Sequence, residues 1–325
     1  MRLTWALILM TTATAASLRA QAALVEAPFP HKPIRVIVPF PAGSATDILA
    51  RVVGQKLTQP LGQNIVVDNR GGGSGSIGAL ALVRATPDGH TLILGGLSML
   101  AVVPALNPGV GYTTKDFAPI SNVVTAPYIL VVHAQVAAAS VTELIALARS
   151  RPGQLSYASA GSGSLAHLAG ELFSRMAAVK LTHVPYKTSA QSVIDVVNGR
   201  IEVLFGTLAP TLPFIQSGRL RVLGVTGTSR VAALPDAPPI TEVGVPGYDV
   251  IFWLGMLAPA ATPPAVIARL NRELLTILTA RETKQTLSAQ GLESTPTTPQ
   301  AFAQLLRDDA VKWREVIQAA GIRGE

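Results

Sequence analysis

The sequence predicts an α/β fold arranged in two domains. Short apolar segments typical of β-strands alternate with amphipathic helical segments along most of the chain, which indicates parallel sheets with helices on both faces. Two stretches rich in Pro and Gly, 107–117 and 233–247, separate the alternating sets. With 325 residues, 49% of them hydrophobic and 14% charged, the chain can form two compact domains and is too apolar to be disordered.

The first set of elements starts with a buried-type strand at 33–40, PIRVIVPF, which runs into a helix at 45–57. Ser44 and Asp47 form a capping-box pattern at the start of that helix. The set continues with a strand at 64–68, a helix at 76–85 and a strand at 91–96.

The second set and the C-terminal part follow the same alternation. The second set comprises strands at 127–133, 155–159, 201–205 and 220–227, with helices at 141–149, 165–177 and 189–198. A further strand is expected at 248–259, and helices at 264–281 and 299–319. Because no strand accompanies these last helices, we expect them to pack against the first domain. The predicted domains are 27–124 together with 231–325, and 125–230, with a cleft between them.

The N-terminus predicts export. Arg2, an apolar stretch and the small residues Ala20-Gln21-Ala22 describe a signal peptide at 1–22, cleaved near Ala22, which predicts a periplasmic protein. Later apolar runs are interrupted by His133, Gln135 or prolines, so we expect no membrane helix. The chain has no cysteine, which suits an oxidising compartment and excludes thiol catalysis and cysteine metal sites.

The charge favours small anionic partners. The formal net charge is +7, and removing residues 1–22 takes away Arg2 and Arg19, which leaves +5. Nucleic acid is the other usual partner of a basic protein, but the Lys and Arg residues are scattered and form no run or aromatic-interleaved patch. We therefore expect no nucleic-acid binding.

Three glycine-rich segments precede helices: FPAGSATD at 40–47, RGGGSGSIGA at 70–79 and YASAGSGSLAH at 157–167. A helix start carries N–H groups without helical partners and a partial positive charge, so it can bind an anion if small residues allow approach. Each segment also has a simple reading as a well-capped helix start. For any one of Ser44, Thr46, Ser162 and Ser164, capping and ligand contact are equally expected.

Catalytic and cofactor motifs are weak. Gly73, Gly75 and Gly78 match G-x-G-x-x-G, but the strand at 91–96 lacks the acidic residue that a dinucleotide site requires. The sequence contains neither G-x-S-x-G nor H-E-x-x-H, and its five histidines show no metal-ligand spacing. His167 and His183 are expected to form local hydrogen bonds rather than to act as bases.

Several blocks together resemble a known family. KPIRVIVPFPAGSATDILAR, VVDNRGGGSGSIGA, YASAGSGSLAHLAGELF and HVPYKTSAQSVIDVVNGRIEVLF are similar, in order and spacing, to segments of the periplasmic receptors of tripartite tricarboxylate transporters, the Bug-type solute-binding proteins. The resemblance covers essentially the whole chain after residue 22. Ser44 and Thr188 depart from it, since glycine is common at both positions.

The resemblance implies a type II periplasmic-binding-protein fold, in which two α/β domains close on a small carboxylate such as a di- or tricarboxylate, an aromatic acid or an amino acid. It implies a monomer that delivers its ligand to membrane permease subunits, without catalysis, cofactor or metal. The implied ligand-binding residues are Pro41, Ala42, Gly43, Ser44, Thr46, Asp47, Ala160, Gly161, Ser162, Gly163, Ser164, Tyr186 and Trp253. Asp47 is expected chiefly to cap the helix and organise its loop.

Two other classes of function stay open. A secreted hydrolase of a small carboxylate ester or amide would need a serine paired with a base, and the sequence shows no recognisable pairing. A ligand-sensing receptor that feeds a membrane sensor would use the same cleft with a different partner.

Overall fold

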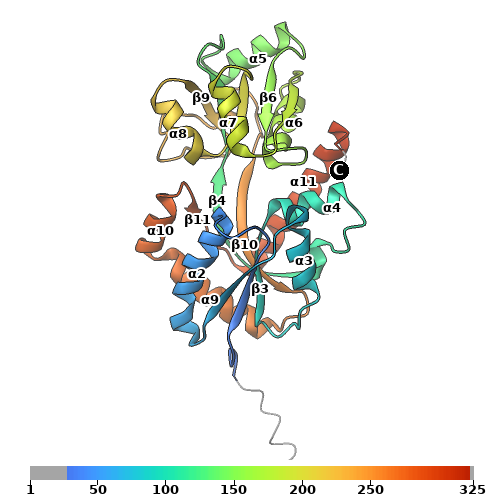
Figure 1. Ribbon diagram of the computed structural model, residues 1–325, viewed down its shortest axis with the longest axis vertical. Helices are drawn as coiled ribbons and strands as arrows, with labels where there is room; N and C mark the ends of the chain where they lie inside the picture. The colour runs from blue at the N-terminus through green and yellow to red at the C-terminus, as the bar shows by residue number, and fades with distance from the viewer. Residues whose placement is uncertain (1–27, 323–325) are drawn as a thin grey trace, which may run out of the picture.

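The computed structural model describes residues 28–322, so the predicted signal peptide at 1–22 lies outside the described part of the chain. Two lobes stand end to end along the long axis of the molecule, each with its own sheet and surrounding helices (Figure 1). The predicted α/β class with two sheets is confirmed.

The first lobe contains a six-stranded sheet with the order β11-β4-β10-β3-β1-β2. Its strands are β1 (Ile34–Val38), β2 (Ile65–Asn69), β3 (Thr91–Gly96), β4 (Phe117–Pro127), β10 (Ile251–Pro259) and β11 (Glu293–Ser294). Strands β1, β2 and β3 are parallel, whereas β10 runs antiparallel to both β3 and β4. Every residue of β3 after Thr91 is buried, as expected for a strand covered on both faces.

The helices of the first lobe are α2 (Ala45–Leu61), α3 (Ser76–Val83), α4 (Val103–Leu106), α9 (Pro264–Thr279), α10 (Arg281–Ser288) and α11 (Pro299–Ala320). Both α9 and α11 pack against β4, so the last helices do return to the first lobe as expected. The helix predicted at 264–281 ends earlier, because Ala280 has an extended backbone and α10 starts after it.

The second lobe contains a five-stranded sheet with the order β7-β6-β8-β5-β9. Its strands are β5 (Ile129–His133), β6 (Ser156–Ser159), β7 (Thr182–Pro185), β8 (Val203–Gly206) and β9 (Leu220–Val225). Its helices are α5 (Val141–Ser150), α6 (Leu165–Met176), α7 (Ser189–Val197) and α8 (Leu208–Gln216). Strands β6, β7 and β8 are parallel, and β5 is antiparallel to β8 and β9.

The strand directions determine which edges of the two sheets face each other. Strand β4 runs in the same direction as β3, since both are antiparallel to β10, so it leaves the first lobe at the carboxyl edge of the parallel strands. After Tyr128 the chain enters β5, whose first residue Ile129 pairs with Gly206 at the end of β8. The carboxyl edges of both sheets therefore face the space between the lobes.

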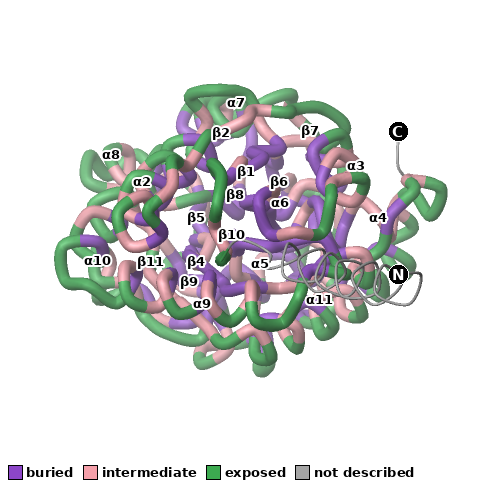
Figure 2. Tube along the Cα trace, turned by 90° about the horizontal axis from the view of Figure 1, so that it is seen from below, coloured by how far each residue is buried: buried purple, intermediate pink, exposed green. Residues whose placement is uncertain are grey.

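A continuous cluster of buried apolar side chains joins the lobes on one side. Trp313 and Ile317 of α11 belong to the same cluster as Tyr157 and Leu168 of the second lobe. Helix α11 contacts α6 in addition to β4. In Figure 2 the buried segments lie inside and the exposed segments around the outside. The two lobes thus share a core beside the crossovers, which are the two segments that connect the lobes around Tyr128 and around Val250.

Several elements were not predicted from the sequence: strands β4, β7 and β11 and helices α4, α8 and α10. Strand β4 begins within the joint expected at 107–117 and contains the polar pair Ser121 and Asn122, which interrupts a strand pattern. In the structure both side chains are buried and hydrogen bond to the segment 295–297. Helix α8 includes Pro213, which disfavours helix in a sequence reading.

The domain boundaries placed at residues 125 and 231 stay a prediction. The segment 238–250 lies beside the five-stranded sheet, because the Val225 N–H donates to Pro238 O at 2.9 Å and the Val250 N–H donates to Thr226 O at 2.8 Å. Within residues 28–322, no helix has both the length and the apolar character that crossing a membrane requires.

Candidate functional site

Two glycine-rich loops lie at the facing edges of the sheets. The first loop, Pro41–Ser44, connects β1 to α2, and the second loop, Ala160–Ser164, connects β6 to α6. Both follow parallel strands, so both lie at a carboxyl edge, where open α/β sheets bind their ligands.

The first loop is shaped by short hydrogen bonds to the start of α2. Gly43 has a φ of 79°, which glycine adopts without strain, and its N–H donates to Asp47 Oδ2 at 2.9 Å. Ser44 is the N-cap, and its Oγ accepts the Asp47 N–H at 3.3 Å. Pro41, Ala42 and Gly43 are exposed, whereas Thr46 is buried.

Asp47 organises the first loop. Its side chain is buried, and its carboxylate accepts from Gly43, from Arg51 at 3.2 Å and from Asn69 at 3.1 Å. The Gly43 hydrogen bond and then the Arg51 hydrogen bond lower the pKa of Asp47 below its ordinary value. Because both carboxylate oxygens are already paired, Asp47 shapes the loop rather than offering a group to a ligand.

The second loop repeats this design. Gly163 has a φ of 75°, and its N–H donates to His167 Nδ1 at 3.0 Å. Ser164 is the N-cap of α6, and its Oγ accepts the His167 N–H at 3.3 Å. Ala160 and Gly161 are half-buried, and Ser162 is exposed. Both loops therefore read Gly-Ser-x-x-acceptor, with Asp47 in one and His167 in the other.

Each loop leaves donors available. The N–H groups of Ala45 and Thr46 in α2, and of Leu165 and Ala166 in α6, have no acceptor among residues 28–322. The capping hydroxyl of Ser44 or Ser164 accepts one hydrogen bond and still has its own proton to donate. Two partially positive helix starts with hydroxyl donors match the chemistry of a carboxylate.

The third glycine-rich segment has a packing role. Gly72, Gly73, Ser74 and Gly75 all have positive φ, and a side chain on Gly71 would lie 3.2 Å from Pro41 N. A side chain on Gly78 would come within 2.9 Å of Pro39 Cβ. The segment thus supports the first loop, and close packing explains its glycines without a nucleotide.

Tyr186 lies beside the second loop. Its N–H donates to Ser159 O at 3.0 Å, and its hydroxyl donates to Asp195 Oδ2 at 2.8 Å. Burial and then the Asp195 hydrogen bond raise the pKa of Tyr186 to about 12. Tyr186 is half-buried, so part of its ring remains open at the edge of the second lobe.

Trp253 is a core residue, in contrast to its predicted place in the cleft. It is 1% exposed, its Nε1–H donates to Asp309 Oδ2 at 2.6 Å, and its ring meets Phe302 edge to face at 5.4 Å. The sequence interpretation was misleading because β10 places this aromatic side chain against α11, a packing partner that lies far along the chain.

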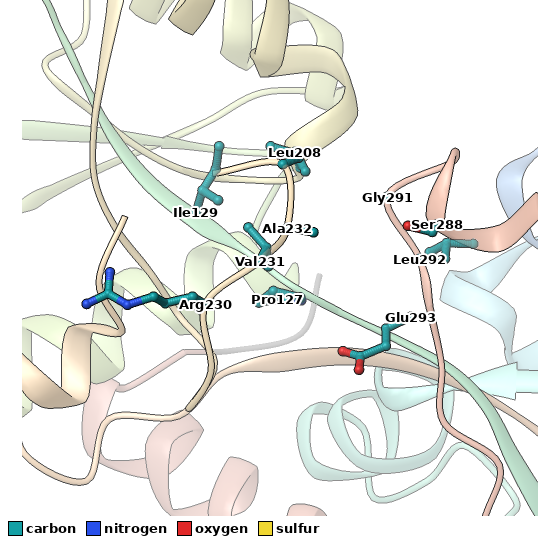
Figure 3. A pocket seen from close by; sticks show the side chains of 11 residues that line it. Pro127, Ile129, Leu208, Arg230, Val231, Ala232, Ser288, Gly291, Leu292 and Glu293 are labelled. Carbon is teal, nitrogen blue, oxygen red and sulfur yellow. The ribbon is translucent and has the colours of Figure 1, made fainter. Parts of the chain in front are cut away.

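A cavity between the lobes involves residues that the sequence analysis did not single out. It has a volume of about 320 Å³ and lies next to the first crossover, with Pro127 and Ile129 on its wall (Figure 3). Arg230 of the second lobe and Glu293 of the first lobe both line it, and the guanidinium of Arg230 points away from the other lining residues (Figure 3). These residues come from loops and strand ends without a recognisable motif, so no sequence signal could have brought them together. Among residues 28–322, no three His, Asp or Glu side chains gather in a way that could bind a metal ion.

Two α/β lobes joined by strand crossovers, with helix starts aimed into the space between them, define a two-lobed solute-binding protein. The chain belongs to the tripartite tricarboxylate transporter receptor family, whose model matches residues 49–322. It is 38% identical to the UPF0065 protein in the tcbD-tcbE intergenic region of Pseudomonas sp., over 89% of this chain and 86% of that protein.

Solved structures agree with the family. The R. palustris protein Rpa4515 with adipate is 34% identical and superposes with a TM-score of 0.77, over 91% of this chain and 99% of the other. MatC from Rhodopseudomonas palustris with bound malate is 28% identical, with a TM-score of 0.72, over 89% of this chain and the whole of the other. The resemblance on which the sequence interpretation relied is therefore confirmed.

Proposed function

We propose that this protein is a periplasmic receptor that captures a small carboxylate between its lobes and delivers it to the permease of a tripartite tricarboxylate-type transporter. The observation that carries the proposal is the pair of matching loops at the facing edges of the two sheets, each with free N–H donors and a capping serine. The dicarboxylates adipate and malate in related structures support this class of ligand.

The proposed ligand contacts are the exposed or half-buried members of the two loops. They are Pro41, Ala42, Gly43, Ser44, Ala160, Gly161, Ser162 and Ser164, with Tyr186 at the edge. The side chains of Thr46 and Asp47 lie behind the first loop because they are buried, and the Gly163 N–H is already paired, whereas the Thr46 N–H remains among the available donors.

The energetics require both loops. One helix start contributes about 0.3 to 1 kcal/mol to a nearby anion, and about 2 kcal/mol when partly buried. Micromolar affinity requires about 8 kcal/mol. Hydrogen bonds to a charged group add roughly 1.5 to 3 kcal/mol each, before ordering costs are subtracted. A ligand that reaches donors from both lobes can meet this requirement, so its binding favours the closed form.

The crossovers provide the proposed hinge. The buried Thr226 joins them: its Oγ accepts the Tyr128 N–H at 2.7 Å and donates to Val250 O at 2.6 Å. Thr226 therefore links the two connecting segments just beyond the last pair of β4 and β10, Pro127 with Ile251, and we propose that the lobes rotate about this point.

The proposal is tested by thermal shift of the protein lacking residues 1–22 with adipate, malate and their diamides. Stabilisation by a diacid and not by its diamide is expected, since ligand at a hundredfold excess over its Kd adds about 2.7 kcal/mol. A shift with the diamides alone would reject a carboxylate receptor.

The two loops are tested by the double variant Ser162→Ala, Ser164→Ala. We expect weaker binding by calorimetry with an unchanged fold, because the variant removes two hydroxyl donors. Ser150→Ala is the matched control, since Ser150 bonds to Leu147 O at the end of α5, away from the loops. Equal affinity in all three proteins would reject the assignment of the second loop.

One observation favours the hydrolase alternative, and another argues against it. Ser159 Oγ lies 2.6 Å from His183 Nε2, a serine–histidine pair that the sequence did not reveal. Ser159, however, has no exposed surface, and its Oγ also bonds Gly161. A substrate could not reach this hydroxyl in the present conformation. Ester turnover that disappears in Ser159→Ala would favour the hydrolase.

A further inference from the structure

We propose that His167 is a positioning residue for the second loop: its uncharged imidazole accepts the Gly163 N–H and thereby fixes the loop in its anion-binding shape. The effect on affinity rests on the proposed function, whereas the effect on loop geometry does not. His167 is 6% exposed, so it acts through the loop and not by touching a ligand.

Comparison of the two loops shows what the acceptor does. In the first loop, Asp47 Oδ2 accepts the Gly43 N–H at 2.9 Å, and in the second, His167 Nδ1 accepts the Gly163 N–H at 3.0 Å. The glycine, the capping serine and the acceptor have the same spacing in both. A peptide whose N–H is bonded inward cannot turn freely, so the acceptor sets the direction of the peptide planes and donors around it.

The difference between the acceptors is their charge. The carboxylate of Asp47 is balanced by Arg51, whose NH2 lies 3.0 Å from Oδ1. The charged side chain beside His167 is Glu171, whose Oε1 lies 3.8 Å from His167 Nε2. A carboxylate at position 167 would add a second negative charge beside Glu171 and would repel an anionic ligand. A neutral acceptor at position 167 avoids this electrostatic repulsion.

His183 supports His167 from the neighbouring strand. The two rings are stacked with their centroids 3.7 Å apart and only 5° between their planes. His183 Nε2 lies 2.6 Å from Ser159 Oγ, which in turn accepts the Gly161 N–H at 3.1 Å. The pair therefore fixes both inner glycines of the loop, one directly and one through Ser159. The ionisable groups packed against the pair are Glu171 and Tyr157.

Protonation would undo the arrangement. A proton on His167 Nδ1 would face the Gly163 N–H, donor against donor, and the inward hydrogen bond would be lost. Burial and the neighbouring His183 lower the pKa of His167 to about 4, so the imidazole is neutral at ordinary pH. Acidification towards pH 4 should loosen the loop.

The first test compares three variants by calorimetry with adipate and malate at pH 7.5. Asparagine has the shape of Asp47, which serves as acceptor in the first loop, so His167→Asn should retain affinity within about threefold. His167→Leu has no acceptor and should lose roughly tenfold or more, the equivalent of one good hydrogen bond. His133→Leu is the matched control, because His133 Nδ1 also accepts a backbone N–H, from Gln135, at the far end of β5.

A pH series separates a positioning role from a merely structural one. The ligand's own carboxyl groups titrate in the wild type and in His167→Asn alike, so the difference between the two profiles reports His167. The wild type should lose about twofold more affinity by pH 4, where half of His167 would carry a proton. Parallel profiles, or equal losses in His167→Asn and His167→Leu, would overturn the proposal.

A measurement without ligand distinguishes failure of this inference from failure of the proposed function. In amide NMR of the free protein, the Gly163 N–H signal should move with the same midpoint as the His167 ring signals. His167→Leu should shift the Gly163 signal and leave Gly43 unchanged. If neither diacid binds but these signals move together, the receptor assignment fails and the positioning role stands. If Gly163 is insensitive to His167, the positioning role fails whatever binds.

Discussion

The stacked pair His167 and His183 should make the protein less stable as the pH falls, with a size that the structure allows us to estimate. Burial lowers the pKa of each ring to about 4, against about 6.5 in the unfolded chain. As the pH falls below 6.5, the unfolded chain takes up protons that the folded protein does not. The unfolding free energy is therefore unaffected by these rings above pH 6.5, and it decreases progressively as the pH falls towards 4.

At pH 5 the ideal loss is about 2 kcal/mol of unfolding free energy for each ring. Because His183 is only half-buried and the two stacked rings titrate as a coupled pair, we expect a smaller loss of about 2 kcal/mol for the pair. The half-buried Asp249 and Asp309 act in the opposite direction, since desolvation raises the pKa of both carboxyls. A comparison that leaves these acids unchanged is therefore needed.

The assay is urea unfolding of the wild type and of the double variant His167→Asn, His183→Asn between pH 7.5 and pH 5. Both proteins contain the same carboxyl groups, so the difference between their two pH slopes reports the histidines. The wild type should lose about 2 kcal/mol more than the variant over this range. Slopes that agree within about 0.5 kcal/mol would mean that the rings titrate normally and that the stack does not exclude protons.

Three further substitutions test the packing inside the first lobe and the link between the two lobes. Gly255→Ala places a Cβ 2.1 Å from Phe302 Cζ, so it should lower the unfolding free energy by about 1 to 3 kcal/mol, and Phe302→Leu in the same chain should restore part of it. Thr226→Val leaves the Tyr128 N–H without its acceptor; we expect a loss of about 1 to 3 kcal/mol and, by small-angle scattering, a wider range of lobe separations, whereas an unchanged profile would argue against a hinge there. Trp253→Phe removes the donor to Asp309, so the pKa of that carboxyl should rise further in a carbon-13 NMR titration, and a fall would contradict the assigned hydrogen bond.

Features that depend on residues close in the chain could be predicted from the sequence. Ser44 and Ser164 do cap α2 and α6, because capping depends on residues three positions apart and on glycines that allow positive φ. The strands before both loops were found for the same reason, since alternation of apolar segments and turns is a short-range signal. His167 forms a local hydrogen bond with Gly163, as expected, whereas the partner of His183 is Ser159, 24 positions away on the neighbouring strand.

Features that depend on residues far apart in the chain could not be predicted from the sequence. Strand β4 contains the buried polar residues Ser121 and Asn122, whose side chains hydrogen bond to Thr297 and Thr295, more than 170 positions away. Trp253 looked like a cleft residue until α11 covered it. The stacked histidines belong to α6 and β7, and no spacing in the chain predicts that their rings meet.

The amino-acid order thus specifies the α/β class, the helix starts and the donors that they present, because each depends on backbone conformation and neighbours within a few residues. The folded arrangement decides that both loops lie at the facing edges of the two sheets, since this follows from the directions of β4 and β5 in separate sheets. It also decides that one loop is shaped by a charged acceptor and the other by a neutral one, because the environments of Asp47 and His167 are formed by side chains from other elements.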